Sequence, residues 1–276
     1  MKIIDFDGLF DEKLTVYMKE NKKKYTAKVW ENKIPKLYKK FGDTYIAKIK
    51  CTPKEYYAKM TDVELVQTLQ THLAEEVAVP DFLLTELENR GAAEFLLPLL
   101  KENETEAAYA LHLLGDSTLA YDEYFSILEE NRFNEDIRSE IVEIFRQNAD
   151  QVKTRAYELY KRGVAKAYMI EILANVLLRE DSIYEILMRE FQEADEKTLP
   201  IVAGYLAVYG DERALPYLLR KIEDKSIGFV EFQELKYAIE ALGGEYDEER
   251  DFTADKDYMA IENAKAKALQ EMQNKE

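Results

Sequence analysis

The stretch AVYGDERALPYLLRKIED (207–224) contains the joint that decides the predicted fold. A Gly-Asp pair, Gly210-Asp211, separates two apolar runs of helical spacing, and Pro216 comes early in the second run. Glycine adopts the left-handed conformation after a helix without steric cost, and aspartate offers an acceptor and a negative charge to the next helix N-terminus. Proline is tolerated in a first helical turn because its missing N–H has no partner there. The stretch therefore predicts a helix–turn–helix joint.

Helical patterns follow one another from about residue 79 onward, with apolar residues at i, i+3, i+4 and i+7. Ile137, Ile141, Ile144 and Phe145 are one such set. The patterns cover 106–116, 120–131, 135–148, 150–163, 164–181, 182–194, 198–211 and 212–224, preceded by a pair over 78–103 and followed by a pattern over 229–245. They form pairs of about 30 residues, a period typical of helical solenoids.

The composition also favours helices. Apolar residues make up 47% of the 276 residues, with only ten Gly and six Pro. One cysteine, Cys51, excludes an internal disulfide and fits a reducing compartment. MKIIDFDGLF reaches Asp5 and Asp7 before a signal-peptide core can form, and no apolar run has the length of a bilayer span. We therefore expect a soluble, cytoplasmic protein.

Three regions are predicted along the chain. Residues 1–77 form a Lys-rich helical N-terminal cap or subdomain, residues 78–245 the repeats, and residues 246–276 a charged C-terminal helix. Within the first region, Pro35 and Gly42 are predicted to break 14–43 into two helices, and Thr61 or Asp62 to cap a third.

VYGDERALPYLLRKIED resembles the HEAT-like repeats of bacterial solenoids, including the type named after phycobilisome lyases, whose units carry a G-D-x-x-A-x-x-x-L core. LLGDSTLAYDEYFSIL (113–128) is similar, with Leu119 where alanine is expected. The resemblance covers about residues 79–245 and implies an all-α fold, a right-handed α-solenoid of HEAT- or armadillo-like helix pairs. Such families contain chromophore lyases and also pure binding scaffolds, so the fold alone leaves function open.

IIDFDGLF (3–10) resembles the first motif of haloacid-dehalogenase-type phosphatases, and GDSTLAYD (115–122) resembles their acidic metal-binding motif. The first lacks the usual threonine after Gly8, and nothing between the two motifs has the pattern of a βαβ sheet. The sequence therefore favours a solvated segment at Asp5 and Asp7 and a repeat turn at Gly115-Asp116. Metal-dependent phosphomonoesterase activity abolished by Asp5→Asn would reverse this interpretation.

Other chemistry is not indicated. His72 and His112 belong to separate helical units, and no Cys/His cluster, EF-hand spacing or glycine-rich phosphate loop occurs. Cys51 has lysines nearby that could lower a thiol pKa, but nothing marks it as a nucleophile. No catalytic residue, cofactor or metal ligand is predicted, and the chain is expected not to be an enzyme.

The net charge of −17 conceals an asymmetry. Residues 1–60 carry 15 lysines, no arginine and 8 acids, a net of +7, and the remainder carries 23 basic and 47 acidic residues, a net of −24. The possible basic patch consists of Lys22, Lys23, Lys24, Lys39 and Lys40, interleaved with Tyr25, Trp30, Tyr38 and Phe41. Such a segment could bind single-stranded nucleic acid, but the absence of arginine weakens that case. The helical spacing of the aromatics favours a core, with the lysines on a solvated outer face. The basic segment could also dock on the acidic repeats.

These features predict a non-enzymatic, protein-binding scaffold. By analogy with HEAT solenoids, the second helix of each pair lines the concave surface, and tyrosines on these helices are candidate anchors. They are Tyr124, Tyr157, Tyr160, Tyr184 and Tyr217, some of which must pack between repeats instead. The expected partner is a protein with a basic surface or tail, and neither nucleic acid nor a membrane is expected. The alternative is nucleic-acid binding or processing through the lysine-rich segment, since some DNA glycosylases use HEAT-like repeats. The oligomeric state is not predicted.

Overall fold

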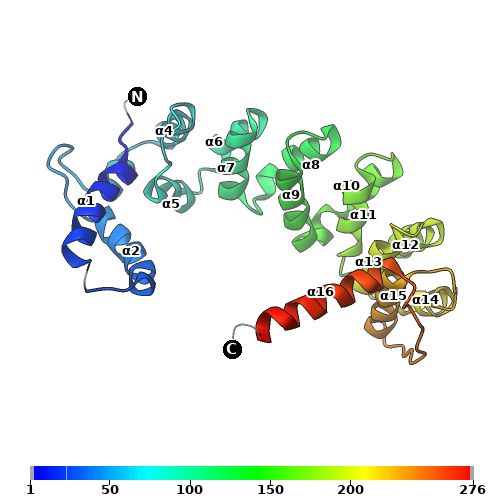
Figure 1. The fold of residues 1–276 in the computed structure, drawn as a ribbon. Helices are drawn as coiled ribbons and strands as arrows, with labels where there is room; N and C mark the ends of the chain where they lie inside the picture. Colours follow the sequence, from blue (N-terminus) through cyan, green and yellow to red (C-terminus); the bar gives the residue numbers. More distant parts are fainter. Residues whose placement is uncertain (1–2, 23, 274–276) are drawn as a thin grey trace. The chain divides into compact units, whose positions relative to one another are not determined.

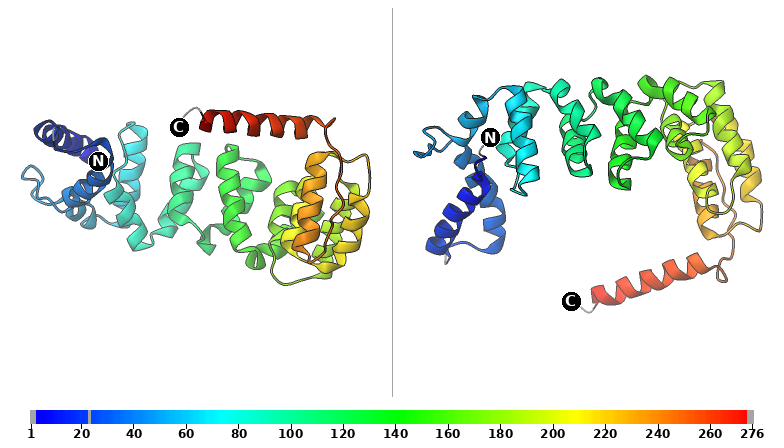
Figure 2. Two further views of the ribbon diagram at one scale, coloured as in Figure 1. Left: turned by 60° about the horizontal axis from the view of Figure 1, so that its bottom comes forward. Right: turned by 90° about the horizontal axis from the view of Figure 1, so that it is seen from above.

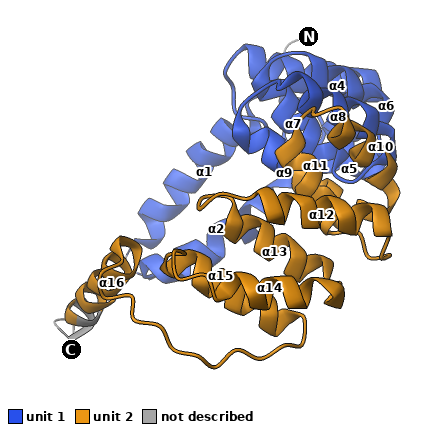
Figure 3. Ribbon diagram, turned by 90° about the vertical axis from the view of Figure 1, so that its right-hand side faces the viewer, with its two compact units in different colours: residues 1–141 blue, residues 142–276 orange. Residues whose placement is uncertain are grey.

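The computed structural model describes residues 3–22 and 24–273, and these residues form helices joined by short loops (Figure 1, Figure 2). They contain sixteen α-helices, three short 3-10 helices and no strand, apart from one isolated β-bridge between Ile46 and Cys51. The predicted all-α class is confirmed. The chain divides into two compact units, residues 1–141 and 142–276 (Figure 3). The ranges 1–77, 78–245 and 246–276 remain predictions.

Unit 1 begins with a hairpin of two long helices and continues with shorter ones. Its elements are α1 (Phe6–Asn21), α2 (Ala27–Gly42), α3 (Pro53–Ala58), α4 (Asp62–Ala74), α5 (Asp81–Arg90), α6 (Ala93–Leu96), η1 (Leu97–Lys101), α7 (Glu104–Leu114), η2 (Thr118–Ala120) and α8 (Tyr121–Glu130). Thr61 caps α4 in a capping box with Glu64, as one of the two expected caps. Helix α9 (Glu135–Gln147) runs across the boundary between the units.

The N-terminal region packs against the helices that follow it. The Tyr38 ring of α2 stacks on the Phe82 ring of α5, with centroids 4.7 Å apart and planes at 9°. The predicted break at Pro35 is wrong, because α2 continues through this residue. Pro35 is exposed, and the buried Trp30 and Phe41 anchor the helix on either side of it, so side-chain packing outweighs the lost backbone hydrogen bond.

Unit 2 contains α10 (Ala149–Lys161), α11 (Lys166–Ala174), α12 (Asp181–Glu193), α13 (Leu199–Tyr209), η3 (Glu212–Ala214), α14 (Leu215–Ile222), α15 (Phe229–Ala241) and α16 (Lys256–Gln273). These helices follow the predicted ones closely, with one exception. The helix predicted over 164–181 ends at Ala174, and a loop leads to α12. The Asp150 carboxylate accepts hydrogen bonds from the backbone N–H groups of Leu177 and Leu178 in this loop, which satisfies donors that a longer helix would have satisfied.

The joint at 207–224 has the predicted form. Gly210 ends α13 in the left-handed conformation, with φ 70° and ψ 33°, and Pro216 lies in the first turn of α14. The Asp211 carboxylate accepts from the backbone N–H of Arg213 and from its guanidinium, at 2.7–3.1 Å. The same guanidinium reaches Asp181, at 2.8 Å, so the joint is tied to the preceding helix pair.

The C-terminal helix α16 packs against α15 near its start. Tyr258 packs against Phe229 of α15, with ring centroids 5.1 Å apart. Residues 259–268 are all exposed, and the helix projects away from α15 in Figure 2.

Arginines from later pairs cap the C-terminal ends of earlier helices. Arg90 donates to the carbonyls of Ala58 and Met60 at the end of α3 and just beyond it, at 3.0 and 2.6 Å. Arg132 donates to Leu100 of η1 at 3.3 Å, and Arg250 donates to Ile222 of α14 at 2.6 Å and to Asp224 at 2.9 Å. Each arginine thus links segments 26 to 32 residues apart, which is about one helix pair.

We expect Arg90→Lys to destabilise unit 1 by about 1–3 kcal/mol, because an ammonium cannot reproduce the planar fork that reaches two carbonyls and Asp62 at once. The measurement is urea unfolding followed by circular dichroism. The exposed Lys59→Arg change is the matched control and should leave the free energy of unfolding unchanged. Equal stability of Arg90→Lys and the wild-type chain would contradict the proposed role of the fork.

The joint also predicts a pH dependence. Hydrogen bonds from Arg213 hold the pKa of Asp211 below its ordinary value of 3.8, so the folded state is stabilised by the ionised carboxylate. This contribution is complete above about pH 4 and is lost as the pH falls through the lowered pKa. Asp211→Asn keeps a capping group but removes the charge, so its free energy of unfolding should fall less steeply below pH 4 than that of the wild-type chain. Parallel pH profiles would contradict the prediction.

Candidate functional site: a groove beside α13

Two of the five predicted tyrosine anchors lie in the core. Tyr124 is fully buried, and its hydroxyl donates to the carbonyl of Gly115 in the preceding turn. Tyr160 is buried, and its hydroxyl donates to Glu190 of α12; burial is the main cause that raises its pKa to about 12. Both rings therefore serve packing between successive helices and offer no surface to a partner.

The other three retain some exposure. Tyr157 and Tyr184 are half-buried, and the Arg213 guanidinium covers the Tyr184 ring at 4.2 Å. Tyr217 on α14 has 48% of its surface exposed and is the most accessible of the five. The structure does not bring the five tyrosines together into one site.

A different helix of unit 2 presents the larger apolar surface. Helix α13 has the sequence LPIVAGYLAVY, which contains no charge. One side of it is buried through Leu199, Val202, Ala203, Leu206 and Tyr209. The other side carries Ile201, Gly204, Tyr205 and Val208, spaced i, i+3, i+4 and i+7, and both Ile201 and Val208 are 54% exposed. A contiguous apolar stripe at helical spacing therefore faces outward.

Neighbouring helices turn this stripe into a groove of about 440 Å³. Tyr237 of α15, 61% exposed, stands along one side together with Glu234. Glu171 of α11 and Asn175, which follows α11, line the groove as well. The groove thus combines an apolar floor on α13 with aromatic and acidic residues from α11 and α15 (Figure 3 shows these helices in unit 2).

The charges around the groove are unevenly balanced. Arg146 at the end of α9 pairs with Glu143 at 3.0 Å and with Glu171 at 3.4 Å. Burial, together with the charge and hydrogen bond of Glu171, raises the pKa of the Tyr205 hydroxyl to about 12, so the phenol stays protonated at neutral pH. Within residues 3–22 and 24–273 no ion pair engages Glu234. The groove is therefore apolar with a surplus of negative charge.

Gly204 opens the middle of the groove. A Cβ atom placed on it would meet no atom within 4 Å, so neither the fold nor the backbone conformation requires a glycine here. Glycine inside a helix costs about 0.5–1 kcal/mol relative to alanine. The residue lowers helix stability and leaves space between Ile201, Tyr205 and Val208.

The sequence contained a signal for this groove that the tyrosine assignment missed. That assignment placed the binding surface on the second helix of each pair, whereas α9, α11, α13 and α15, which line the groove, are first helices. The signal is the sequence of α13, which contains no charged residue. Such a helix has apolar side chains on every face, and it exposes some of them wherever no other helix covers it.

The lysine-rich segment has the packing that the sequence favoured. Trp30 and Phe41 are buried, and Tyr25 meets Trp30 edge to face at 5.1 Å. The lysines Lys22, Lys24, Lys39 and Lys40 are exposed, and Lys23 lies outside the described residues. Because the rings pack against one another, they offer few free faces on which bases could stack, so this geometry does not favour nucleic-acid binding.

The phosphatase-like motif has a structural role. The expectation that Asp5 and Asp7 are merely solvated is wrong in part. The Asp5 carboxylate caps α1 by accepting from the backbone N–H of Gly8 at 2.7 Å, and the half-buried Asp7 accepts from the Tyr38 hydroxyl at 2.5 Å. Burial raises the pKa of Asp7. Asp5 precedes a helix and follows no strand, and Gly115-Asp116 forms the expected turn after α7.

The remaining candidate residues are scattered. His72 is fully buried in α4, His112 is exposed, and Cys51 is buried. No group of three His, Cys, Asp or Glu side chains in the described part of the chain is arranged to hold a metal ion. Across residues 3–22 and 24–273, no helix is both long and apolar enough to cross a membrane.

A larger hollow in unit 1, of about 610 Å³, lies between α2, α3 and α5. Two of its four charged lining residues form ion pairs: Lys54 binds Asp43 at 2.9 Å, and Glu86 binds Arg90 at 2.7 Å. Two lysines and two acidic residues line this hollow, so its charges balance, whereas the α13 groove has a surplus of negative charge.

No family model, curated protein or solved structure matches this chain. The resemblance to HEAT-like repeats therefore remains a prediction from the residues quoted above.

We expect Gly204→Ala to stabilise unit 2 by about 0.5–1 kcal/mol, because it removes the glycine penalty in α13 without a steric clash. Denaturant unfolding measures the change. Gly210→Ala is the contrasting variant: Gly210 has a φ of 70°, and a Cβ atom added there would lie 2.8 Å from the Arg179 guanidinium, so this change should destabilise. A loss of stability in Gly204→Ala would show that the glycine has a structural role.

Proposed function

We propose that the chain is a non-enzymatic scaffold, a HEAT-like right-handed α-solenoid, that binds a partner protein in the groove beside α13. The observation that supports the proposal best is the outward-facing apolar stripe of Ile201, Tyr205 and Val208 on a helix that is fully packed on its other side. An exposed contiguous apolar surface is typical of interaction sites, and aromatic residues such as Tyr237 are frequent anchors of interfaces.

The negative charge of the groove favours a partner segment that carries positive charge. Glu171 and Glu234 line it, and unit 2 as a whole carries 28 acidic and 19 basic residues, a net of −9. A segment that places apolar side chains on α13 and lysine or arginine beside the glutamates would complement both features. Association should therefore weaken at high salt, because charges at the rim of an interface are screened.

Selection of peptides from a random library against the whole chain tests the proposal. The selected peptides should combine apolar residues with Lys or Arg, and their affinity should fall at least about thirtyfold in the double variant Ile201→Glu/Val208→Glu, as expected for central interface residues. Leu178→Glu is the matched control, because Leu178 is also exposed in unit 2 but lies outside the groove. Loss of binding in this control, or its retention in the double variant, would contradict the proposal.

Filling the groove gives a second readout. Gly204→Leu adds volume where the structure has open space, so the fold should persist while the selected peptides are excluded. Circular dichroism reports the fold, and fluorescence anisotropy of a labelled peptide reports binding. Unchanged affinity in a folded Gly204→Leu variant would move the binding site away from α13.

A further inference from the structure

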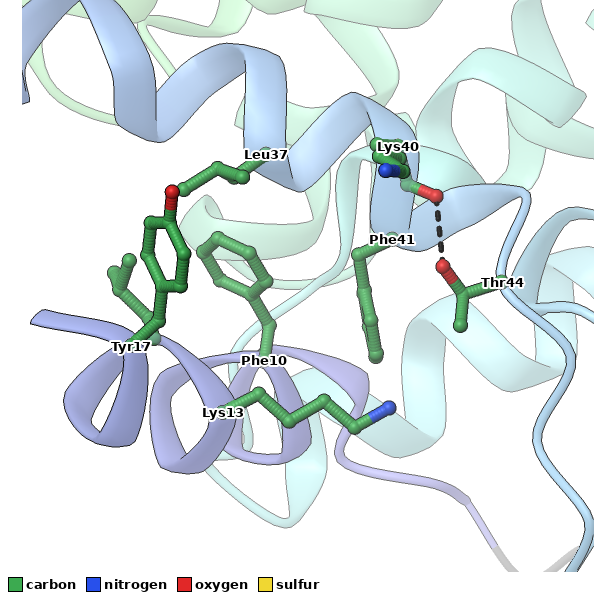
Figure 4. Close-up of a pocket in the computed structure, with 8 residues that line it drawn as sticks. Phe10, Lys13, Tyr17, Leu37, Lys40, Phe41 and Thr44 are labelled. Atoms are coloured by element: carbon green, nitrogen blue, oxygen red, sulfur yellow. Dashed lines mark hydrogen bonds between the residues drawn. The ribbon is translucent and has the colours of Figure 1, made fainter. Parts of the chain in front are cut away.

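A second apolar hollow lies at the other end of the chain, between α1 and α2 in unit 1 (Figure 4). Phe10 and Tyr17 project from α1, and Leu37 and Phe41 project toward them from α2. Leu14 of α1 also lines the hollow. The Phe10 and Phe41 rings are buried, with centroids 5.6 Å apart, whereas Leu14, Tyr17 and Leu37 are half-buried. The two rings form a rigid base, and the other three side chains leave apolar surface open.

The size of this pocket suits one side chain. Its volume is about 170 Å³, and cavities of about 150 Å³ lined by apolar side chains hold a molecule of the size of benzene. A leucine or phenylalanine side chain of a partner would therefore fill the pocket. A longer ligand would place only a few of its atoms against the apolar lining.

Two lysines are the charged residues that line the pocket. Lys13 lies over the Phe41 ring, with its Nζ atom 5.0 Å from the centroid, and Lys40 follows Leu37 by one helical turn on α2. Both are exposed, and within residues 3–22 and 24–273 neither forms an ion pair. The surrounding residues 1–60 have a net charge of +7, so this surface is opposite in sign to the rest of the chain.

We propose that this pocket is a second docking site, for an acidic amphipathic helix of a partner protein. One bulky apolar side chain of that helix occupies the space between Leu14, Tyr17 and Leu37, and carboxylates one turn to either side contact Lys13 and Lys40. Phosphate backbones would match the lysines but not the apolar pocket, and the Phe10 and Phe41 rings are closed against each other and cannot stack with bases. The chain would then connect an acidic partner at its N-terminal helices with a basic partner at α13.

A designed helical peptide is the probe. It consists of alanine and glutamate, is long enough to form a helix at about 15 residues, and carries one central leucine with glutamates at i−4 and i+4. Fluorescence anisotropy with the full chain should show saturable binding that weakens with salt. A peptide with the leucine replaced by alanine and one with all glutamates replaced by lysine should each bind at least about tenfold more weakly.

Charge reversal in the protein locates the site. Lys13→Glu/Lys40→Glu should weaken binding roughly tenfold or more, whereas Lys28→Glu/Lys48→Glu, which makes the same change in net charge on exposed residues outside the pocket, should not. The groove variant Ile201→Glu/Val208→Glu should also leave this affinity unchanged, so that the two proposals succeed or fail separately. Circular dichroism confirms that each variant is folded.

Three outcomes would overturn the proposal. Equal weakening by both lysine pairs would indicate nonspecific attraction to the basic segment. Equal affinity for the leucine and alanine peptides would exclude occupation of the pocket. Absence of peptide binding, combined with Lys13/Lys40-dependent binding to phosphatidylcholine vesicles containing phosphatidylserine or to a single-stranded oligonucleotide, would assign the surface to a membrane or to nucleic acid instead.

Discussion

Short helices stacked in pairs leave many backbone carbonyls without a partner, because the last four of every helix have none inside it. In both units this requirement is met partly by arginines from about one pair further along. Arg90, Arg132 and Arg250 each place a guanidinium on carbonyls at the end of an earlier helix, and Arg250 also covers the Phe232 ring at 4.9 Å. A rigid fork that satisfies several acceptors at once fixes the spacing between neighbouring pairs more tightly than nonspecific apolar contact does.

This mode of stacking also creates the candidate binding surface. Helix α13 contacts α11 and α12 before it and α15 after it in the chain, so it must be apolar on more than one side. The outward-facing side of α13 is apolar as well, and Gly204 leaves room there between Ile201 and Val208. A sequence selected only for stability would place alanine or a polar residue there. The exposed stripe therefore supports the proposed binding site on α13.

Local features were predictable, and non-local ones were not. The Gly210-Asp211 turn, Pro216 in a first turn and the Thr61 cap depend on neighbouring residues alone, so the sequence predicts them correctly. Pro35 does not end α2, because Trp30 and Phe41 on either side of it are buried, and Phe41 packs against Phe82 of α5. The sequence does not separate the buried Tyr124 and Tyr160 from the exposed Tyr217, because exposure depends on which helices pack on each side. The uncharged sequence of α13 indicates exposed apolar surface, but the groove beside it also depends on residues of α11 and α15 that only the folded chain brings together.

The distribution of the two basic residue types follows from these different tasks. Arginine is absent from residues 1–60, whereas at the joints between pairs its planar fork holds carbonyls and carboxylates in fixed geometry, as Arg213 does with Asp181 and Asp211. Lysine is a point charge on a flexible stem and suits recognition that tolerates variable geometry. Lys13 and Lys40 lie beside an apolar pocket with the volume of one side chain. Their flexible side chains can reach carboxylates on a partner helix, and the side chain bound in the pocket would fix the position of that helix. Under the proposal, Lys13 and Lys40 contact the partner, whereas the arginines at the joints hold neighbouring helix pairs together.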